Sequence, residues 1–327
     1  MRSTRDTMKT RASPDDVHLH LLKDITCEPI FILGLHRSGT SILYKMLGNT
    51  GHFNTVQAYH ILKYDELLTN HLNHRDQQAY QEIDDLFRAK GITNRRIDQL
   101  PISADFAQEY VYLFEQKKYG NTMSTDTVPL FSNLCRKIHL ISDNNKPILF
   151  KNPYDFPNFL FIKRMFPTAK FIFIHRDPLD VISSTMRAWQ TLYTKRNPYT
   201  ALFSPRYKQA TANPLVFYGI KTWYCSRLAP GFYGVLHRAQ KATTYYLDNI
   251  DKLPPGDHVS ISYEALCREP SDTMRHVLTF LNVESTQDFS DYIKPRRLQF
   301  TPEVEKRKSY ILREMQRYFK YLQDTFP

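Results

Sequence analysis

The segment FILGLHRSGTSILYKML, residues 31–47, constrains the fold more than any other part of the chain. A short apolar run before Gly34 is typical of a buried strand, and residues 40–49 have helical spacing with a glycine stop. A glycine-containing loop between a strand and a helix presents backbone N–H groups at the positive end of the helix, where anions bind. The side chains and amides at this turn belong to Arg37, Ser38, Gly39, Thr40 and Ser41. The sequence therefore predicts a site for a phosphate-like group.

The same turn differs from the phosphate loop of nucleotide triphosphatases. Gly34 and Gly39 have the separation of GxxxxGK[ST], but Thr40 stands where that loop has its lysine. The strands nearby end in no convincing magnesium-binding aspartate, so Arg37 must neutralise charge that a metal would otherwise handle. A small-molecule kinase with an altered loop stays an alternative, and it would need magnesium and ATP.

Strand and helix patterns alternate along much of the chain. Residues 148–151 and 169–175 are apolar strands on either side of a helical stretch at 158–166, and 258–263 is a further strand. We expect a single α/β domain over residues 1–327, with a central parallel sheet, a flexible basic tail at 1–12 and a helical insertion at 60–145.

Three further helices are predicted from spacing and end signals. One covers 76–91 and closes on Gly91, and a second opens on Ser103 and closes near Gly120. A third opens at Thr301. Its apolar positions fall three, four or seven residues apart and are Val304, Ile311, Met315, Tyr318 and Leu322.

The chain is basic, with a formal net charge of +11 at pH 7, which favours anionic partners such as phosphate, sulfate or nucleic acid. The cysteines lie far apart without a CxxC pair, so the sequence predicts neither a zinc site nor a disulfide framework. They are Cys27, Cys135, Cys225 and Cys267. No apolar run approaches the roughly 18 residues of a membrane span, and the first residues lack the apolar stretch of a secretory signal. We therefore expect a soluble, cytoplasmic protein in a reducing compartment.

A second basic turn follows the strand at residues 171–175. Arg176 comes directly after it, and a helix is predicted to begin near Pro178. The triplet His-Arg-Asp at this point partly matches a protein-kinase catalytic loop, but Ile182 stands where that loop requires asparagine. The turn is therefore interpreted as a second anion site.

Together the two turns resemble the sulfotransferases that use 3′-phosphoadenosine-5′-phosphosulfate (PAPS). In that family a loop of the form [KR]-S-G-T-[TS] binds the 5′-phosphosulfate, and a strand ending in Arg-Asp-Pro with a later serine binds the 3′-phosphate. Arg176 and Ser184 match the second pattern. The passage from 149 to 178 is similar to a Lys-x-Pro segment of tyrosylprotein and bacterial members and puts Lys151 at their spacing. Residues 261–283 are similar to their Tyr-Glu-x-Leu strand and following helix.

This resemblance implies a P-loop-like, three-layer α/β/α fold. It also implies an enzyme that moves a sulfuryl group from PAPS to a hydroxyl or amine by in-line displacement, without a metal. Arg37 would contact the sulfate, Lys151 would stabilise the leaving phosphate, and Ser38, Gly39, Thr40 and Ser41 would complete the loop.

The general base is assigned less directly. Tyrosylprotein-type relatives have a glutamate where this chain has Ala58, and cytosolic relatives use a histidine. His60 lies close by and has a side chain whose ordinary pKa, about 6.5, suits removal of a hydroxyl proton. We predict His60 as the base, with His52, Asp65 and Glu66 as alternatives.

The remaining basic residues leave several interpretations open. Lys294, Arg296 and Arg297 stand where family members often have a loop that closes over the nucleotide, so Lys294 and Arg296 are predicted to bind it. Residues 190–209 interleave aromatic and basic side chains, as in a nucleic-acid or glycan surface. A nucleic-acid-binding module would explain the charge but not the two turns. We expect a nucleotide and a hydroxyl acceptor as partners and no nucleic acid; the acceptor and the oligomeric state stay open.

Overall fold

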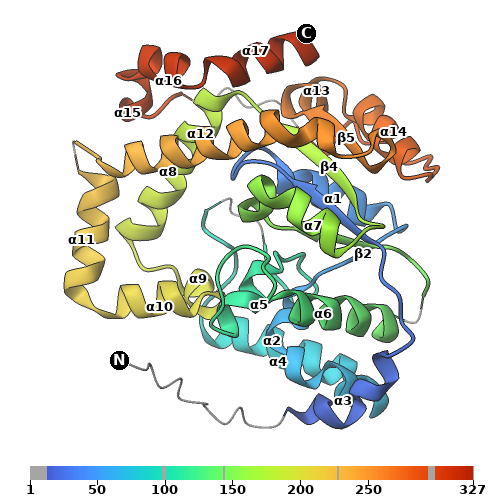
Figure 1. The fold of residues 1–327 in the computed structure, drawn as a ribbon. Coiled ribbons are helices and arrows are strands. Elements are labelled where there is room, and N and C mark those ends of the chain that lie inside the picture. The colour runs from blue at the N-terminus through green and yellow to red at the C-terminus, as the bar shows by residue number, and fades with distance from the viewer. Residues whose placement is uncertain (1–12, 98–100, 143, 227, 294–298, 327) are drawn as a thin grey trace, which may run out of the picture.

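A single parallel sheet organises the chain. The computed structural model describes residues 13–97, 101–142, 144–226, 228–293 and 299–326. Its five strands have the order β2-β3-β1-β4-β5, so the first long strand lies between the third and fourth (Figure 1). The strands are β1 Pro29–Leu33, β2 Asn54–Thr55, β3 Ile148–Lys151, β4 Lys170–His175 and β5 His258–Ser262. The predicted central parallel sheet is confirmed.

Alternating side chains divide the strands between two buried cores, because successive residues of a strand point to opposite faces. Phe31 pairs in register with Phe150 and Phe171, and all three belong to one core. Ile30 and Ile32 belong to the other. The first core includes α6 Val128–Ile141, α7 Phe159–Met165, α8 Pro178–Thr194 and α12 Gly231–Asn249; the second includes α1 Thr40–Asn49, α13 Tyr263–Arg268 and α14 Pro270–Phe280. Helices therefore cover both faces, in the three layers that the resemblance implied.

The predicted insertion contains short helices and an irregular stretch. Its helices before α6 are α2 Ala58–Leu62, α3 Leu67–Leu72, α4 Asp76–Ala89 and α5 Val111–Gln116, with a 3-10 turn at Tyr64–Glu66. The helix expected from Ser103 begins only at Val111. Before it, Ala107 forms an isolated antiparallel bridge with Gln57, and the Gln108 N–H donates to the Val56 carbonyl at 2.7 Å. Pairing with the chain after β2 satisfies backbone groups that a helix would have used.

The carboxy-terminal region differs from the single helix that was expected. It forms α15 Pro302–Glu305, α16 Lys308–Glu314 and α17 Gln316–Thr325, interrupted at Arg307 and Met315. Val304, Ile311 and Tyr318 are nevertheless buried, as their spacing predicts. The interruptions let the apolar positions follow the surface of the first core.

Further elements lie outside the sheet layers. A 3-10 helix spans Pro14–Leu22 and is capped by Ser13, whose hydroxyl accepts from the Asp15 N–H at 3.2 Å. Helices α9 Pro198–Phe203, α10 Pro205–Ala212 and α11 Pro214–Cys225 form a corner beside α8 (Figure 1). Remaining 3-10 turns are Pro153–Asn158, Ile250–Lys252 and Pro255–Asp257.

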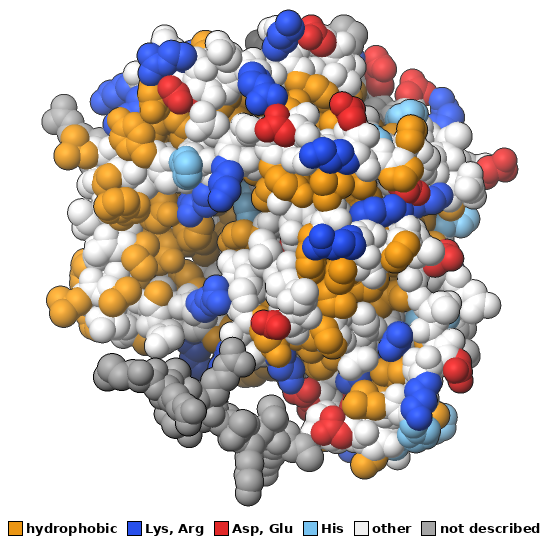
Figure 2. Space-filling view, in the orientation of Figure 1, with side chains coloured by type: hydrophobic (Ala, Val, Ile, Leu, Met, Phe, Trp, Pro, Cys, Tyr) orange, Lys and Arg blue, Asp and Glu red, His pale blue; other side chains and the backbone are white. Residues whose placement is uncertain are grey.

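Helix α11 leaves apolar side chains in solvent. None of its residues is buried, and Leu215, Tyr218 and Trp223 are exposed. Figure 2 shows hydrophobic surface on the same side of the molecule. The inner face of this helix packs through Phe217, Ile220 and Tyr224, and the Tyr224 ring stacks at 5.1 Å on Trp189 of α8.

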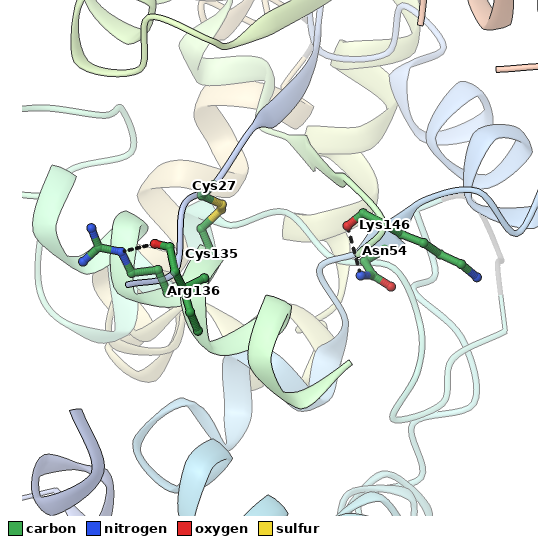
Figure 3. Close-up of a disulfide and its surroundings, with 6 residues drawn as sticks. Cys27, Asn54, Cys135, Arg136 and Lys146 are labelled. Carbon is green, nitrogen blue, oxygen red and sulfur yellow. Dashed lines mark hydrogen bonds between the residues drawn. A yellow bond between two sulfur atoms is a disulfide. The ribbon is translucent and has the colours of Figure 1, made fainter. Parts of the chain in front are cut away.

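The cysteine prediction is wrong in one respect, because Cys27 and Cys135 form a disulfide (Figure 3). Their Cα atoms lie 6.3 Å apart, within the range that a disulfide can bridge. Cys27 precedes β1 and Cys135 lies in α6, and the Arg136 Nε donates to the Ile25 carbonyl beside the bond. The pair could not be predicted from the sequence, because the two cysteines are far apart in the chain and only the fold places α6 beside the start of β1.

In the described parts of the chain, every helix is too short or too polar to cross a membrane.

Candidate active site

The carboxyl ends of three neighbouring strands bring the predicted residues together. Ile32 of β1 lies opposite Lys151 of β3, and Leu33 lies opposite Phe173 of β4. The loop after β1, the last residue of β3 and the turn after β4 therefore meet at one edge of the sheet. In open parallel sheets this edge is where ligands bind.

The first turn is held tightly against β4 and α13. A Cβ on Gly34 would lie 2.4 Å from the Ile174 carbonyl oxygen, so only glycine fits there. Gly39 caps α1 with a φ of 103°, a conformation that side chains disfavour. Arg37 also has a positive φ, 71°, which is strained for a residue with a side chain. The backbone is thus fixed in the compact shape that presents amides at the start of α1.

A buried hydroxyl at this turn has no hydrogen-bond partner. The Ser38 side chain is buried, and its Oγ contacts no donor or acceptor among the described residues. A buried polar atom without a partner is costly, and a bound anion would supply one. The residues present therefore fit a phosphate or sulfate group.

Direct hydrogen bonds interlock the two basic turns. Arg176 donates from Nη1 to the Arg37 carbonyl at 3.1 Å, and Arg37 donates from Nε to the Ser184 hydroxyl at 3.1 Å. The Arg176 guanidinium also lies 4.1 Å from the centre of the Tyr263 ring. The structure thus brings Arg37, Arg176 and Ser184 to one place, as a shared ligand requires.

Lys151 connects the first turn with the insertion. Its Nζ donates to the Ser41 hydroxyl at 2.8 Å and to the Glu109 carboxylate at 2.6 Å, and its side chain is 3% exposed. Sequence reasoning did not identify Glu109, which lies in the irregular stretch where a helix was expected. The apolar residues around Glu109 have helical spacing, and Glu109 belongs to no recognisable sequence motif.

Positive charge around Glu109 keeps its carboxylate ionised. Burial alone would raise the pKa of this group, but the charges of Lys151 and Arg95 hold the pKa below its usual range. His36 follows the reverse pattern. Burial lowers the pKa of His36 to about 4, and its Nε2 has no hydrogen-bond partner among the described residues. At neutral pH the site therefore combines an ionised carboxylate with a neutral imidazole.

His60 lies apart from this cluster. Its Nδ1 accepts from the Gln57 N–H at 3.0 Å within α2, and burial lowers its pKa to about 3. It lines a cavity of about 240 Å³ together with Tyr80 and Ser142, a cavity whose described lining includes no other predicted site residue. These surroundings do not favour His60 as the base.

The alternatives to His60 are also elsewhere. His52 is exposed, Asp65 binds Lys117 at 2.6 Å, and Glu66 lies 3.6 Å from Lys63. The predicted nucleotide contacts Lys294 and Arg296 lie outside the described residues, as does Arg297.

Comparison with known proteins agrees with this arrangement. The fold and the paired turns define an α/β protein with two basic turns at the carboxyl edge of its sheet. The model of the sulfotransferase family matches residues 29–213, and this chain belongs to that family.

Two similar solved structures share the fold. Sulfotransferase STF9 from Mycobacterium avium is 13% identical with a TM-score of 0.64, over 94% of this chain and 80% of that one. Sulfotransferase STF1 from Mycobacterium tuberculosis H37Rv is 12% identical with a TM-score of 0.56, over 92% of this chain and 79% of that one. No curated protein matches the chain.

Proposed function

We propose that this sulfotransferase moves a sulfuryl group from PAPS to a hydroxyl or amine. The hydrogen bond from Arg176 to the Arg37 carbonyl carries the proposal, because it joins the two turns to which the resemblance assigns opposite ends of one nucleotide. Family membership supports the same chemistry. A kinase is not favoured, because Thr40 occupies the position of the phosphate-loop lysine.

The residues divide into two anion sites. The loop amides of Gly39, Thr40 and Ser41 bind the 5′-phosphosulfate together with the Ser38 hydroxyl, which has no hydrogen-bond partner among the described residues. The Ser38 N–H instead donates to the Leu35 carbonyl at 3.1 Å. Arg176 and Ser184 bind the 3′-phosphate. The Nε of Arg176 is buried without a partner among the described residues, so this group has capacity for a further acceptor.

Arg37 and Lys151 supply fixed positive charge for the transfer. PAPS, when bound, provides the activated sulfuryl group. Arg37 donates to the sulfate oxygens from its guanidinium, whose Nε also donates to the Ser184 hydroxyl. Lys151 donates to the leaving phosphate from its position beside Ser41.

A thermal-shift experiment with adenosine 3′,5′-bisphosphate (PAP) tests the proposal. A ligand that binds the native state alone raises the melting temperature, and binding at 100 times its Kd adds about 2.7 kcal/mol. We expect PAP to stabilise the wild type more than adenosine 5′-phosphate, which lacks the 3′-phosphate. The variant R176A should lose this preference.

The matched control is R164A, which removes an exposed arginine of α7. It should respond to PAP like the wild type. Equal responses to PAP and adenosine 5′-phosphate in the wild type would contradict the assignment of a 3′-phosphate site.

We also propose a cellular location for the protein. The expectation of a soluble, cytoplasmic protein used unpaired cysteines as one argument, and the Cys27–Cys135 disulfide removes that argument. Disulfides persist chiefly in oxidising compartments. A cytoplasmic location therefore stays a prediction, and free-thiol labelling of the protein in its own cells tests it.

We also propose that the partners are the nucleotide and a hydroxyl acceptor, without nucleic acid. The interlocked turns account for anion binding at one point, whereas a nucleic-acid surface would need cations along an extended face.

A further inference from the structure

A buried ion pair joins the anion loop to a carboxylate that no part of the proposed function uses. Lys151 Nζ contacts the Glu109 carboxylate at 2.6 Å and the Ser41 hydroxyl at 2.8 Å. The Glu109 carboxylate is therefore two hydrogen bonds from the loop proposed to bind the phosphosulfate. The two side chains are 3% and 12% exposed, so solvent screens the pair weakly.

Among the acidic and neutral side chains that face one another here, Glu109 is the one that is ionised near pH 7. Lys151 and Arg95 lower its pKa against the effect of burial. Burial raises the pKa of Tyr154 to about 12 and raises that of Tyr112 well above its usual value. Both tyrosines and His36 are therefore neutral near pH 7, and Glu109 is ionised.

We propose that Glu109 is the general base of the transfer and that Lys151 holds it in an ion pair until a donor phosphate binds the lysine. This inference rests on the proposed function. Once Lys151 donates to phosphate, Glu109 loses its nearest cation and gains a nearby anion. Both changes raise the pKa of the carboxylate and make it a better proton acceptor.

In the proposed sulfuryl transfer, the Glu109 carboxylate takes the proton of the acceptor O–H while the acceptor oxygen forms a bond to sulfur. The bond between sulfur and the 5′-phosphate oxygen breaks, and its electron pair stays on that oxygen. The products are a sulfate ester, PAP and a protonated Glu109, which then releases its proton to solvent.

The test compares E109Q with E115Q. Glu115 is also a buried glutamate, but it hydrogen-bonds the neutral Ser204, so E115Q controls for loss of a buried carboxylate. Turnover is measured as PAP release from PAPS, with phenol, whose hydroxyl stays protonated at neutral pH, and with water alone as acceptors. PAP affinity is measured by calorimetry on the same preparations.

We expect E109Q to lower turnover about 100-fold or more, the usual contribution of a general base. It should bind PAP at least as tightly as the wild type, because Lys151 no longer has to leave a carboxylate. With saturating PAPS we expect the wild-type rate to decline at acid pH as Glu109 becomes protonated, and E109Q should lose this decline. E115Q should retain turnover and affinity.

Three results overturn the proposal. One is wild-type turnover in E109Q, and another is a loss of PAP affinity in E109Q as large as its loss of turnover, which indicates a structural role. The third is a larger loss of turnover in H36Q than in E109Q. A wild type that neither binds PAP nor releases it from PAPS overturns the proposed function itself.

Discussion

Gly39 shows how a single residue determines the shape of the loop between β1 and α1. Its φ of 103° places the N–H at the start of α1, and a Cβ there would lie 2.4 Å from the Tyr263 ring. The same ring lies under the Arg176 guanidinium. A side chain at position 39 would therefore disturb both turns at once.

We predict that G39A lowers the free energy of unfolding by about 2–4 kcal/mol. About 1 kcal/mol comes from the left-handed backbone, and the rest comes from overpacking against Tyr263. Urea denaturation of wild type and variant measures the difference.

G51A is the matched control for this substitution. Gly51 also has a positive φ, 74°, but a Cβ there meets nothing within 4 Å. It should cost only the backbone contribution of about 1 kcal/mol. Equal losses in the two variants would show that contact with Tyr263 does not constrain the loop.

At the scale of elements, one buried carboxylate fastens the 3-10 helix Pro14–Leu22 to the insertion. Asp15 accepts from the backbone N–H groups of Leu68 and Thr69 in α3, at 3.0 and 2.9 Å. It also accepts from Lys137 of α6 at 2.7 Å, and both side chains of this pair are almost fully buried. Three elements therefore depend on one charge.

We predict that D15N lowers the free energy of unfolding by about 3–5 kcal/mol at pH 7, because it leaves the Lys137 charge buried without its partner. D16N is the control. Asp16 is exposed, and within the described part of the chain it accepts only from the Ser13 N–H, so its loss should cost about 1 kcal/mol or less. Chemical denaturation that gives D15N and D16N equal stability would contradict the assignment.

Acid titration gives a second prediction for the same group. Burial acts to raise the pKa of Asp15, but the bonds from Lys137, Thr69 and Leu68 outweigh it and hold the pKa below its usual value. A lowered folded pKa adds stability above the unfolded value, about 4, and loses it as pH falls further. The stability of D15N should therefore depend less on pH below 4 than that of the wild type. Denaturation at a series of acid pH values measures this.

The sequence predicted helices and strands correctly where the local pattern of apolar residues agrees with the tertiary packing. The apolar runs of β1, β3 and β4 are buried on both faces, so their composition alone marks them as strands. The segment around Glu109 has helical spacing, yet its backbone pairs with Val56 and Gln57. Its conformation depends on a partner about 50 residues away, which spacing does not reveal.

At the scale of the whole molecule, the residues of the two basic turns and of the Lys-x-Pro segment lie close together because they are at the carboxyl ends of adjacent strands. Arg37 lies in the loop after β1, Lys151 is the last residue of β3 and Arg176 follows β4, and parallel strands bring their carboxyl ends to one edge of the sheet. The positions of Glu109, in the insertion, and of Cys135, in α6, depend on contacts with distant parts of the chain. Neither the carboxylate nor the disulfide could therefore be identified from the sequence.

The disulfide should contribute to the stability of the entire chain, because Cys27 and Cys135 are 108 residues apart and enclose most of the insertion. Closing a loop of that length restricts the unfolded chain, so we predict that C27S lowers the free energy of unfolding by about 2–5 kcal/mol. Reductant should bring the wild type to the same value and leave C27S unchanged. C225S, which removes a free cysteine, should unfold like the wild type. Four free thiols in the denatured, unreduced protein, or a wild type insensitive to reductant, would contradict a disulfide that stabilises this fold.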